Sequence, residues 1–229
     1  MKFLDLTEQN GRLHDEVLDA LEKVMKHGRF VMGPEIDQVE TELAAFVGVS
    51  HCSCVSNGTA ALLIAMLAVG VKPGDEVIVP DFTFVAPAEM IMLLGAKPVP
   101  VDIDPITYNI DPKSIEESIS SKTKAIVAVS LFGQCADFDA VNKIAAANNI
   151  PVIEDAAQSF GGAIRGKKVG TFGDIAATSF YPAKPLGCYG DGGAIFTDND
   201  NLAEECRAIR IHGTKNDKYN SEMIGLNGR

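Results

Sequence analysis

Two residues of opposite charge stand where a protein could do cofactor chemistry. Asp155 ends the apolar run 151–155, and Lys184 lies further along, in the segment 178–187. A lysine amine can form an imine with an aldehyde, and a carboxylate can keep a pyridine nitrogen protonated. Together the two groups are the minimum that pyridoxal phosphate requires of a protein. Taken singly, Asp155 is equally well explained as a helix cap, and most lysines are solvated surface groups.

A phosphate group could be held where the first predicted strand turns into a helix. Ser56, Asn57, Gly58 and Thr59 follow an apolar run and open a helical segment. Free amides at a helix N-terminus, with Gly58 allowing close approach and Thr59 donating a hydroxyl, form a phosphate cup. A plain capped turn would have the same sequence. Ser179, at the end of another strand-like run, could add a hydroxyl to the cup or satisfy a strand-end amide.

Two more side chains follow predicted strand ends. Phe84 comes shortly after the run 76–80 and could stack on a planar ring, or lie in the core under its loop. Gln158 comes three residues after Asp155, where its amide could bind a ring hydroxyl or face solvent. The glycine-rich run 187–193 suits a backbone packed closely against another group, although a flexible loop has the same composition.

Strand-like and helix-like segments alternate along most of the chain. Strands are predicted at 52–56, 76–80, 98–102, 124–130, 151–155, 175–179 and 193–197. Helices are predicted at 15–27, 34–46, 59–69, 85–94, 112–119, 137–148 and 201–212. The alternation predicts an α/β fold with a mostly parallel, seven-stranded sheet and helices on both faces. Ligands bind beyond the carboxyl ends of such strands, so the candidate groups could share one site.

Composition excludes several classes of function. The 229 residues are 46% hydrophobic, enough for a large core, and the net charge of −11 argues against nucleic-acid and anionic-membrane binding. No apolar stretch approaches the roughly 20 residues of a membrane span, and the first residues lack a signal-peptide core, so a cytoplasmic location is expected. The five scattered cysteines lack metal-site spacing, so no metal is expected. A nicotinamide dehydrogenase is disfavoured because no Gly-x-Gly-x-x-Gly turn follows a strand.

Six short motifs occur together and in order, and their combination is far more specific than any one of them. They are Ser56–Thr59, Pro73–Val77, Val101–Asp104, Glu154–Gln158, Ser179–Lys184 and Gly190–Ala194. The set resembles the DegT/DnrJ/EryC1/StrS family of pyridoxal phosphate-dependent sugar aminotransferases, which have the aspartate aminotransferase fold type I. Segments 133–139 and 184–193 are most similar to members that aminate the 3-keto group of a UDP-linked N-acetylglucosaminuronate. Those members serve bacterial surface-polysaccharide synthesis, including lipopolysaccharide O-antigen.

The resemblance implies a role for each residue of the catalytic pair and the cup. Lys184 bonds covalently to the cofactor and then moves the proton, and Asp155 pairs with the pyridinium nitrogen. The phosphate is held by Gly58, Thr59 and Ser179. The implied amino donor is glutamate, and the implied acceptor is a keto sugar nucleotide.

The resemblance also implies roles for residues around the ring and at the end of the chain. Phe84 stacks on the ring and Gln158 contacts its hydroxyl. Asn227 reaches the phosphate bound by the neighbouring subunit, in a homodimer with shared active sites. Arg229 meets an acidic group of the substrate.

The domain organisation follows from the same resemblance. Residues 1–20 are expected to form an N-terminal arm and the start of the first helix, and residues 21–229 the cofactor-binding large domain. Family members are longer, so the C-terminal small domain is expected to be absent from this chain. The alternative function is a catalytically inactive remnant that binds pyridoxal phosphate or a nucleotide sugar, or only dimerises.

Overall fold

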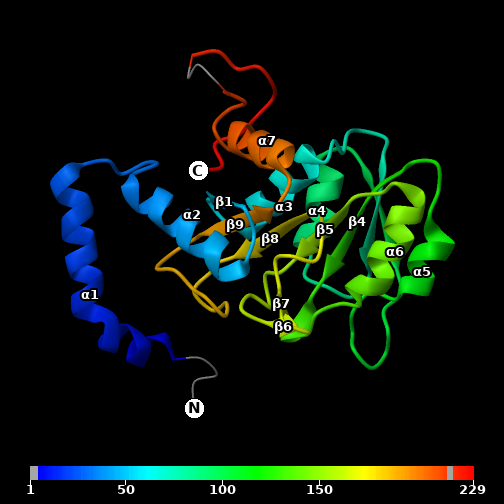
Figure 1. Ribbon diagram of the computed structural model, residues 1–229, viewed down its shortest axis with the longest axis horizontal. Helices are drawn as coiled ribbons and strands as arrows, with labels where there is room; N and C mark the ends of the chain where they lie inside the picture. The colour runs from blue at the N-terminus through cyan, green and yellow to red at the C-terminus, as the bar shows by residue number, and fades with distance from the viewer. Residues whose placement is uncertain (1–4, 216–218) are drawn as a thin grey trace.

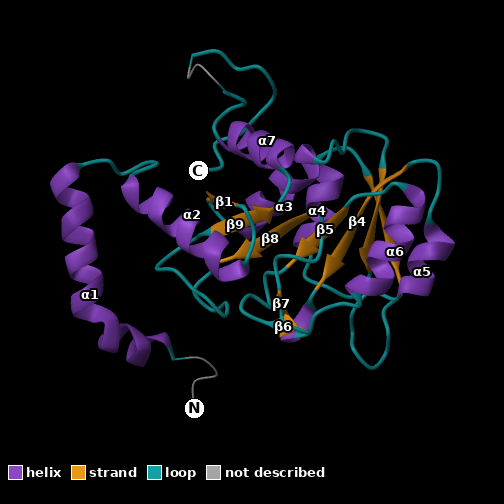
Figure 2. Cartoon of the chain, viewed as in Figure 1, coloured by secondary structure: helices purple, strands orange, loops and turns teal. Residues whose placement is uncertain are grey.

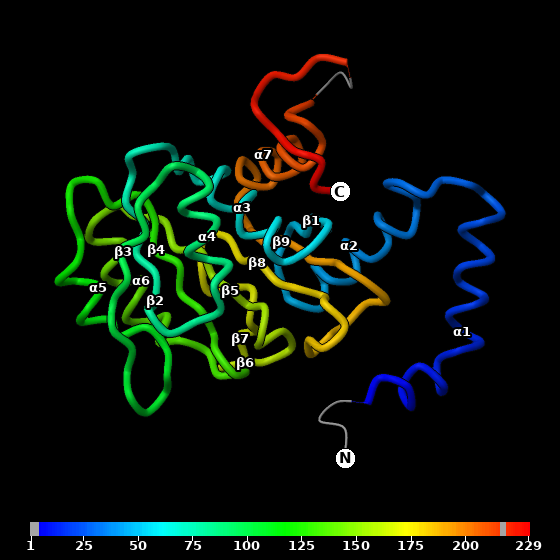
Figure 3. Tube along the Cα trace, turned by 180° about the vertical axis from the view of Figure 1, so that it is seen from behind, coloured from blue at the N-terminus to red at the C-terminus, as the bar shows by residue number. Residues whose placement is uncertain are grey.

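A seven-stranded sheet forms the centre of the computed structural model, which describes residues 5–215 and 219–229. The strand order is β1-β9-β8-β5-β4-β2-β3. Figures 1 and 2 show the sheet, and Figure 3 also labels β2 and β3. Strands β3, β2, β4, β5 and β8 pair in parallel, and β9 runs antiparallel to both β8 and β1. The bounds are β1 His51–Val55, β2 Glu76–Pro80, β3 Lys97–Val101, β4 Thr123–Val129, β5 Val152–Asp155, β8 Ile175–Ser179 and β9 Gly193–Thr197. The predicted fold class is confirmed.

Helices cover both faces of the sheet, because successive residues of each strand point to opposite sides. In β2, Val77 belongs to the core shared with α3 (Gly58–Ala68), α4 (Ala86–Leu93) and α7 (Asp200–Arg210). The next residue, Ile78, belongs to the core shared with α5 (Pro112–Ser118) and α6 (Phe138–Asn148). Helix α2 (Pro34–Val47) covers the β1, β8 and β9 end of this second face. The result is a three-layer α/β/α arrangement.

Helix α1 (Leu6–His27) stands apart from the sheet (Figures 1 and 3). None of its residues is buried, and Leu18, Leu21 and Met25 expose half or more of their surface. The helix begins at Leu6, with Asp5 as its cap, and not near residue 15 as the sequence predicted. The predicted start was too late because the polar first half of the helix carries no apolar stripe. No break falls at residue 20. An isolated helix draws little stability from propensity alone, so this apolar face suits packing against further protein.

Smaller elements complete the fold. A two-stranded hairpin joins β6 (Ala163–Ile164) to β7 (Lys167–Lys168), and a single 3₁₀ turn, η1 (Leu131–Gly133), follows β4. Neither was predicted, because segments of two or three residues are too short to show a hydrophobic period. Within residues 5–215 and 219–229, no helix combines the length and the apolar character needed to cross a membrane.

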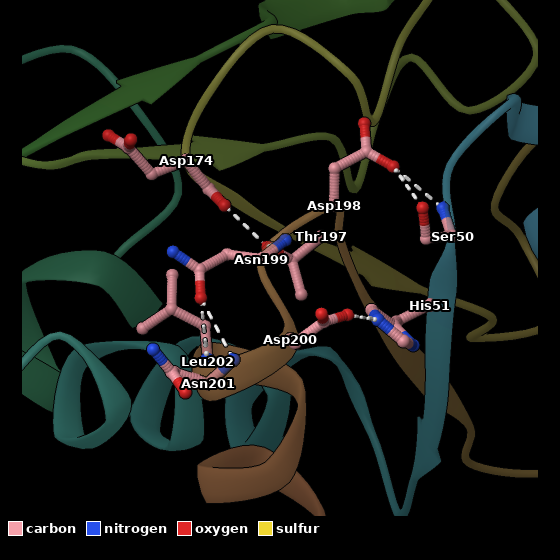
Figure 4. A network of polar contacts seen from close by, with 9 residues as sticks. All are labelled: Ser50, His51, Asp174, Thr197, Asp198, Asn199, Asp200, Asn201 and Leu202. Atoms are coloured by element: carbon pink, nitrogen blue, oxygen red, sulfur yellow. Dashed lines mark hydrogen bonds and ion pairs between the residues drawn. The ribbon is translucent and has the colours of Figure 1, made fainter.

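Polar contacts fix the start of α7 to the start of β1 (Figure 4). The Ser50 amide and hydroxyl both donate to one Asp198 carboxylate oxygen, at 2.7 and 2.9 Å. His51 Nε2 lies 2.7 Å from Asp200 Oδ1. Asn199 caps the helix by accepting from two amides of its first turn. These contacts hold the edge strand β1 in register at the end opposite the cavity described below.

A buried ion pair joins α2, β1 and α7. The Arg210 guanidinium, with only 5% of its side chain exposed, pairs with Glu40 and donates to the Cys54 carbonyl at 2.7 Å. Glu40 in turn accepts from the Cys54 amide at 2.7 Å. Because both charged groups are largely shielded from water, removing one leaves the other uncompensated.

We expect Arg210→Met to lower the free energy of unfolding by about 3–5 kcal/mol, since Glu40 would keep its buried charge without a partner. Urea denaturation followed by circular dichroism measures this. Arg165→Met is the matched control, because the Arg165–Asp139 pair is more than 80% exposed on both sides and should contribute little. Equal losses in the two variants would contradict the expectation.

Candidate active site

A cavity of about 700 Å³ opens at the carboxyl ends of β2, β4, β5 and β8, beside the N-terminus of α3. The residues meet there because these parallel strands all end at one edge of the sheet. Val129, Asp155 and Ala177, the last or near-last residues of three neighbouring strands, are in direct register. The predicted residues that line the cavity are Gly58, Thr59, Phe84, Asp155, Gln158, Ser179 and Lys184.

Asp155 forms part of the floor of the cavity and is 6% exposed. Burial raises the pKa of its carboxyl group, while the Ala157 amide and the nearby Lys184 charge lower it. One oxygen, Oδ1, accepts the Ala157 amide at 3.0 Å. The residues that follow form turns and no helix, so Asp155 does not cap a helix. A buried carboxylate with an open cavity in front of it is suited to a cationic ring nitrogen.

Lys184 lines the same cavity and is half-buried. Its amide donates to the Tyr181 carbonyl at 2.8 Å, in a turn that follows β8 directly. Asp155 lines the same cavity, and the Lys184 charge lowers the pKa of its carboxyl group. Lys184 is therefore not one of the fully solvated surface lysines.

The phosphate cup is built from the first turn of α3 and the end of β8. Asn57 caps the helix by accepting the Ala60 amide at 2.8 Å. The amides of Gly58 and Thr59 are left at the open N-terminus, where helix geometry gives them no intrahelical acceptor. A side chain on Gly58 would put its Cβ 2.6 Å from the Ser179 Cβ, so the helix end and the strand end touch only because residue 58 is glycine.

We expect Gly58→Ala to weaken binding of pyridoxal phosphate by about 10-fold or more, because the added methyl group must push the helix end away from Ser179. An absorbance titration with the cofactor measures the change. Gly11→Ala is the control, since Gly11 lies in α1 with no atom near the position of an added Cβ, and it should bind as the unsubstituted chain does. Similar affinities for both variants would refute the cup.

Phe84 and Gln158 complete the wall facing the cup. Phe84 is 64% exposed, so the alternative that it lies in the core under its loop is wrong, and its ring is open to a ligand. Gln158 Oε1 accepts the Phe132 amide at 3.0 Å. An amide group has one oxygen and one NH2, so the NH2 end remains for the cavity. The contact with Phe132 was missed, because nothing in the sequence links a glutamine to a turn that lies far from it along the chain.

Other cavity residues also escaped the sequence analysis. Thr83, Tyr181 and Asp191 also line the cavity, and the sequence analysis gave none of them a role, although Tyr181 and Asp191 lie within two of the six motifs. Gly193, in β9, is packed so that an added Cβ would lie 2.6 Å from the Asn57 carbonyl carbon. The glycine-rich run around residue 193 was the signal, and its physical reason is this close contact with the cup.

The structure does not bring Asn227 and Arg229 into the cavity of their own chain. They lie in the final segment of the chain, on either side of Gly228. The Gly228 carbonyl accepts from the Ser56 amide at 2.8 Å, and the Gly228 amide donates to the Arg210 backbone carbonyl at 2.9 Å. The side chains of Asn227 and Arg229 are both exposed. Their roles stay predictions. In the described part of the chain, no group of three or more His, Cys, Asp or Glu side chains is placed to hold a metal ion.

The chain belongs to the DegT/DnrJ/EryC1/StrS aminotransferase family, which it matches over residues 12–229. It is 53% identical, over its whole length, to the UDP-2-acetamido-2-deoxy-3-oxo-D-glucuronate aminotransferase of Pseudomonas aeruginosa, of which it covers 64%. It is 49% identical to the pleiotropic regulatory protein of Geobacillus stearothermophilus, with 99% of this chain and 61% of that protein covered. The chain thus spans less than two thirds of the length of these relatives.

Solved structures show the same fold. A DegT/DnrJ/EryC1/StrS aminotransferase from Brucella abortus superposes with a TM-score of 0.97 at 43% identity, covering all of this chain and 63% of that one. The NtdA protein of Bacillus subtilis, solved with bound cofactor PMP, superposes with a TM-score of 0.89 at 38% identity, covering 94% of this chain and 49% of that one. The fold is therefore that of fold-type-I sugar aminotransferases.

Proposed function

We propose that this chain is the cofactor-binding part of a pyridoxal phosphate-dependent aminotransferase that acts on a nucleotide-linked keto sugar. Pyridoxal phosphate is the cofactor of the family to which the chain belongs. The observation that carries the proposal is a single cavity that holds Lys184, Asp155 and the α3 cup together. Any one of these groups has an ordinary explanation, but the three together match the amine, the carboxylate and the phosphate site that this cofactor needs.

The residues present fit the cofactor. Gly58 and Thr59 offer amides where Ser179 closes the other side of the cup, and only a glycine fits this contact. The exposed ring of Phe84 offers a stacking surface. Asp155 is buried and faces the cavity, so an opposing positive charge would favour its ionised form.

Each side chain has a task that follows from its place. When bound, the cofactor supplies an electron sink for the carbon that loses its proton. Lys184 would hold and move that proton, because its side chain lines the cavity that would hold the cofactor. Asp155 would keep the ring nitrogen protonated, and the Gln158 NH2 would serve as a donor to the ring oxygen. The apolar walls formed by Leu62, Phe84 and neighbouring residues limit access of water.

For the substrate, we propose a UDP-linked 3-keto N-acetylglucosaminuronate, aminated at the expense of glutamate during the synthesis of bacterial surface polysaccharide. Support comes from the 53% identity to a relative named for that 3-oxo-glucuronate substrate. A further relative, from Acidithiobacillus ferrooxidans and 40% identical, is named as a 3-aminotransferase of a UDP-linked 3-dehydro-glucosamine. The position of Arg229 at an exposed site is compatible with binding an acidic sugar group.

We also propose a homodimer in which Asn227 serves the cavity of the partner, and a cofactor-binding domain that comprises residues 21–229. Two observations support the dimer. The exposed Asn227 lies outside the cavity of its own chain, and the apolar face of α1 is uncovered. Sedimentation analysis tests this assembly directly.

The central test is chemical labelling. The chain is saturated with pyridoxal phosphate, reduced with borohydride and digested, and mass spectrometry locates the phosphopyridoxyl group, which we expect on Lys184. Conversion of glutamate to 2-oxoglutarate by the protein is the second expected result. Folded, cofactor-saturated protein with Lys184 unlabelled would overturn the proposal. Label without 2-oxoglutarate would favour a protein that only binds the cofactor.

A further inference from the structure

The Gln158 side chain is hydrogen-bonded to a backbone amide of the turn that follows β4. The Phe132 amide donates to Gln158 Oε1 at 3.0 Å, across 26 residues of sequence. A backbone N–H can pair with the oxygen of a side-chain amide but not with its NH2 group, so this bond settles which way the amide points. The NH2 end is left for the cavity that Gln158 lines. Residue 132 thus decides whether Gln158 presents a donor or an acceptor to a ligand.

The backbone that makes this bond is strained. Phe132 has φ 55° and ψ 22°, in the left-handed region that residues with a Cβ avoid. Gly133 follows with φ +88°, so two successive residues with positive φ lie shortly after the end of β4. A non-glycine residue persists in such a conformation only where its surroundings fix it, and such residues cluster at functional sites.

Two other aromatic rings pack around the ring of Phe132. The Phe132 ring lies 6.5 Å from the Phe82 ring and 6.4 Å from the Tyr108 ring, and the latter two are 5.6 Å apart. Tyr108 is itself left-handed, with φ 58°. The three rings come from the loops after β2, β3 and β4, and each remains about half exposed or more. Their edge-to-face and tilted geometries are favourable for aromatic pairs.

We propose that Phe132 is a positioning residue: its left-handed backbone fixes the Gln158 amide so that the NH2 group donates into the cavity. The inference rests on the proposed function, since the acceptor it serves is the ring oxygen of pyridoxal phosphate. A donor on that oxygen stabilises its ionised form, and the nitrogen that links Lys184 to the cofactor then holds its proton less tightly. Phe132 acts on this equilibrium only through Gln158.

The test compares Phe132→Leu with Phe132→Ile. The two substituents are isomers and both lack the ring, but isoleucine is branched at Cβ and tolerates the left-handed region far less well than leucine. After pyridoxal phosphate is added, the visible absorbance of the Lys184–cofactor complex is titrated with pH. We expect the midpoint of Phe132→Leu to stay near that of the unsubstituted chain. Phe132→Ile should shift upward by about one pH unit, a roughly 10-fold change that matches loss of one hydrogen bond to a charged group.

Two variants of Gln158 show whether the effect passes through that side chain. Gln158→Leu sets the size of the full shift, and adding Phe132→Ile to it should change nothing further. Gln158→Glu keeps an oxygen for the Phe132 amide but removes the NH2 donor, so its midpoint should also rise. An unchanged midpoint in Gln158→Glu would contradict the inference even where Phe132→Ile does not fold.

The outcomes separate this inference from the proposed function. No cofactor band in the unsubstituted chain would defeat both. A normal band with equal midpoints for Phe132→Leu and Phe132→Ile would overturn the role of Phe132 alone. So would additive shifts in the double variant, or an unchanged midpoint in Gln158→Glu.

Discussion

Lys184→Arg should abolish covalent attachment of pyridoxal phosphate, leaving no phosphopyridoxyl mass on the chain after borohydride reduction. Arginine keeps the positive charge beside Asp155, but a guanidinium cannot lose its proton and so cannot condense with the aldehyde. The substitution therefore removes the covalent bond and retains the electrostatics that act on Asp155. The loss of the proton-transferring amine should also lower turnover by about 10²–10⁴-fold.

Lys168→Arg is the matched control for this experiment. Lys168 lies in β7, contacts the Phe46 ring in α2, and is not among the residues that line the cavity. Its substitution should leave the label on Lys184 intact. Label of equal yield in Lys184→Arg, at any other lysine, would mean that the cavity does not select this amine, and the assignment of Lys184 would fail.

Much of the site followed from the ends of the strands. The sequence predicted β2, β8 and β9 with the bounds that the structure shows, because Gly, Pro and charged residues border short runs of β-branched and small apolar residues. Asp155 and Ser179 are the last residues of two adjacent strands. The alternation of strands and helices along the sequence was enough to predict that both would lie at the same edge of the sheet. In a parallel sheet, the carboxyl ends of adjacent strands lie side by side even when the strands are far apart along the chain.

Contacts that depend on packing could not be predicted in this way. The fit of Gly193 against Asn57 is a contact between a strand and a helix start, and no local pattern encodes it. The Phe132–Gln158 bond needs a left-handed turn, which residues other than glycine rarely adopt. The start of α1 at Leu6 was missed although Asp5 is a good cap, because a mostly polar first half gives no period to read.

Asp155→Asn should weaken binding of pyridoxal phosphate by about 30-fold or more at neutral pH, since it removes one partner of a buried charge pair. Asparagine has nearly the same shape and can still accept the Ala157 amide, so the floor of the cavity is preserved. The change isolates the negative charge. Absorbance titrations with the cofactor, repeated across a range of pH, measure the loss, and an unchanged affinity would show that Asp155 is not the partner of the ring nitrogen.

The same variant should be more stable than the unsubstituted chain when no cofactor is present. Burial raises the pKa of Asp155 in the folded state, and the Ala157 amide and the Lys184 charge only partly offset it. A raised pKa means that folding favours the neutral carboxyl group. The contribution of Asp155 to folding stability is therefore complete below its pKa in the unfolded chain, and is lost as pH rises through its pKa in the folded chain. Asparagine is neutral throughout, so its stability advantage should grow with pH in this window.

Cofactor affinity of the unsubstituted chain should fall as Asp155 becomes protonated on acidification, whereas the low affinity of Asp155→Asn should not change over that range. Higher stability joined to weaker binding would identify Asp155 as a charge kept in the core for the ligand.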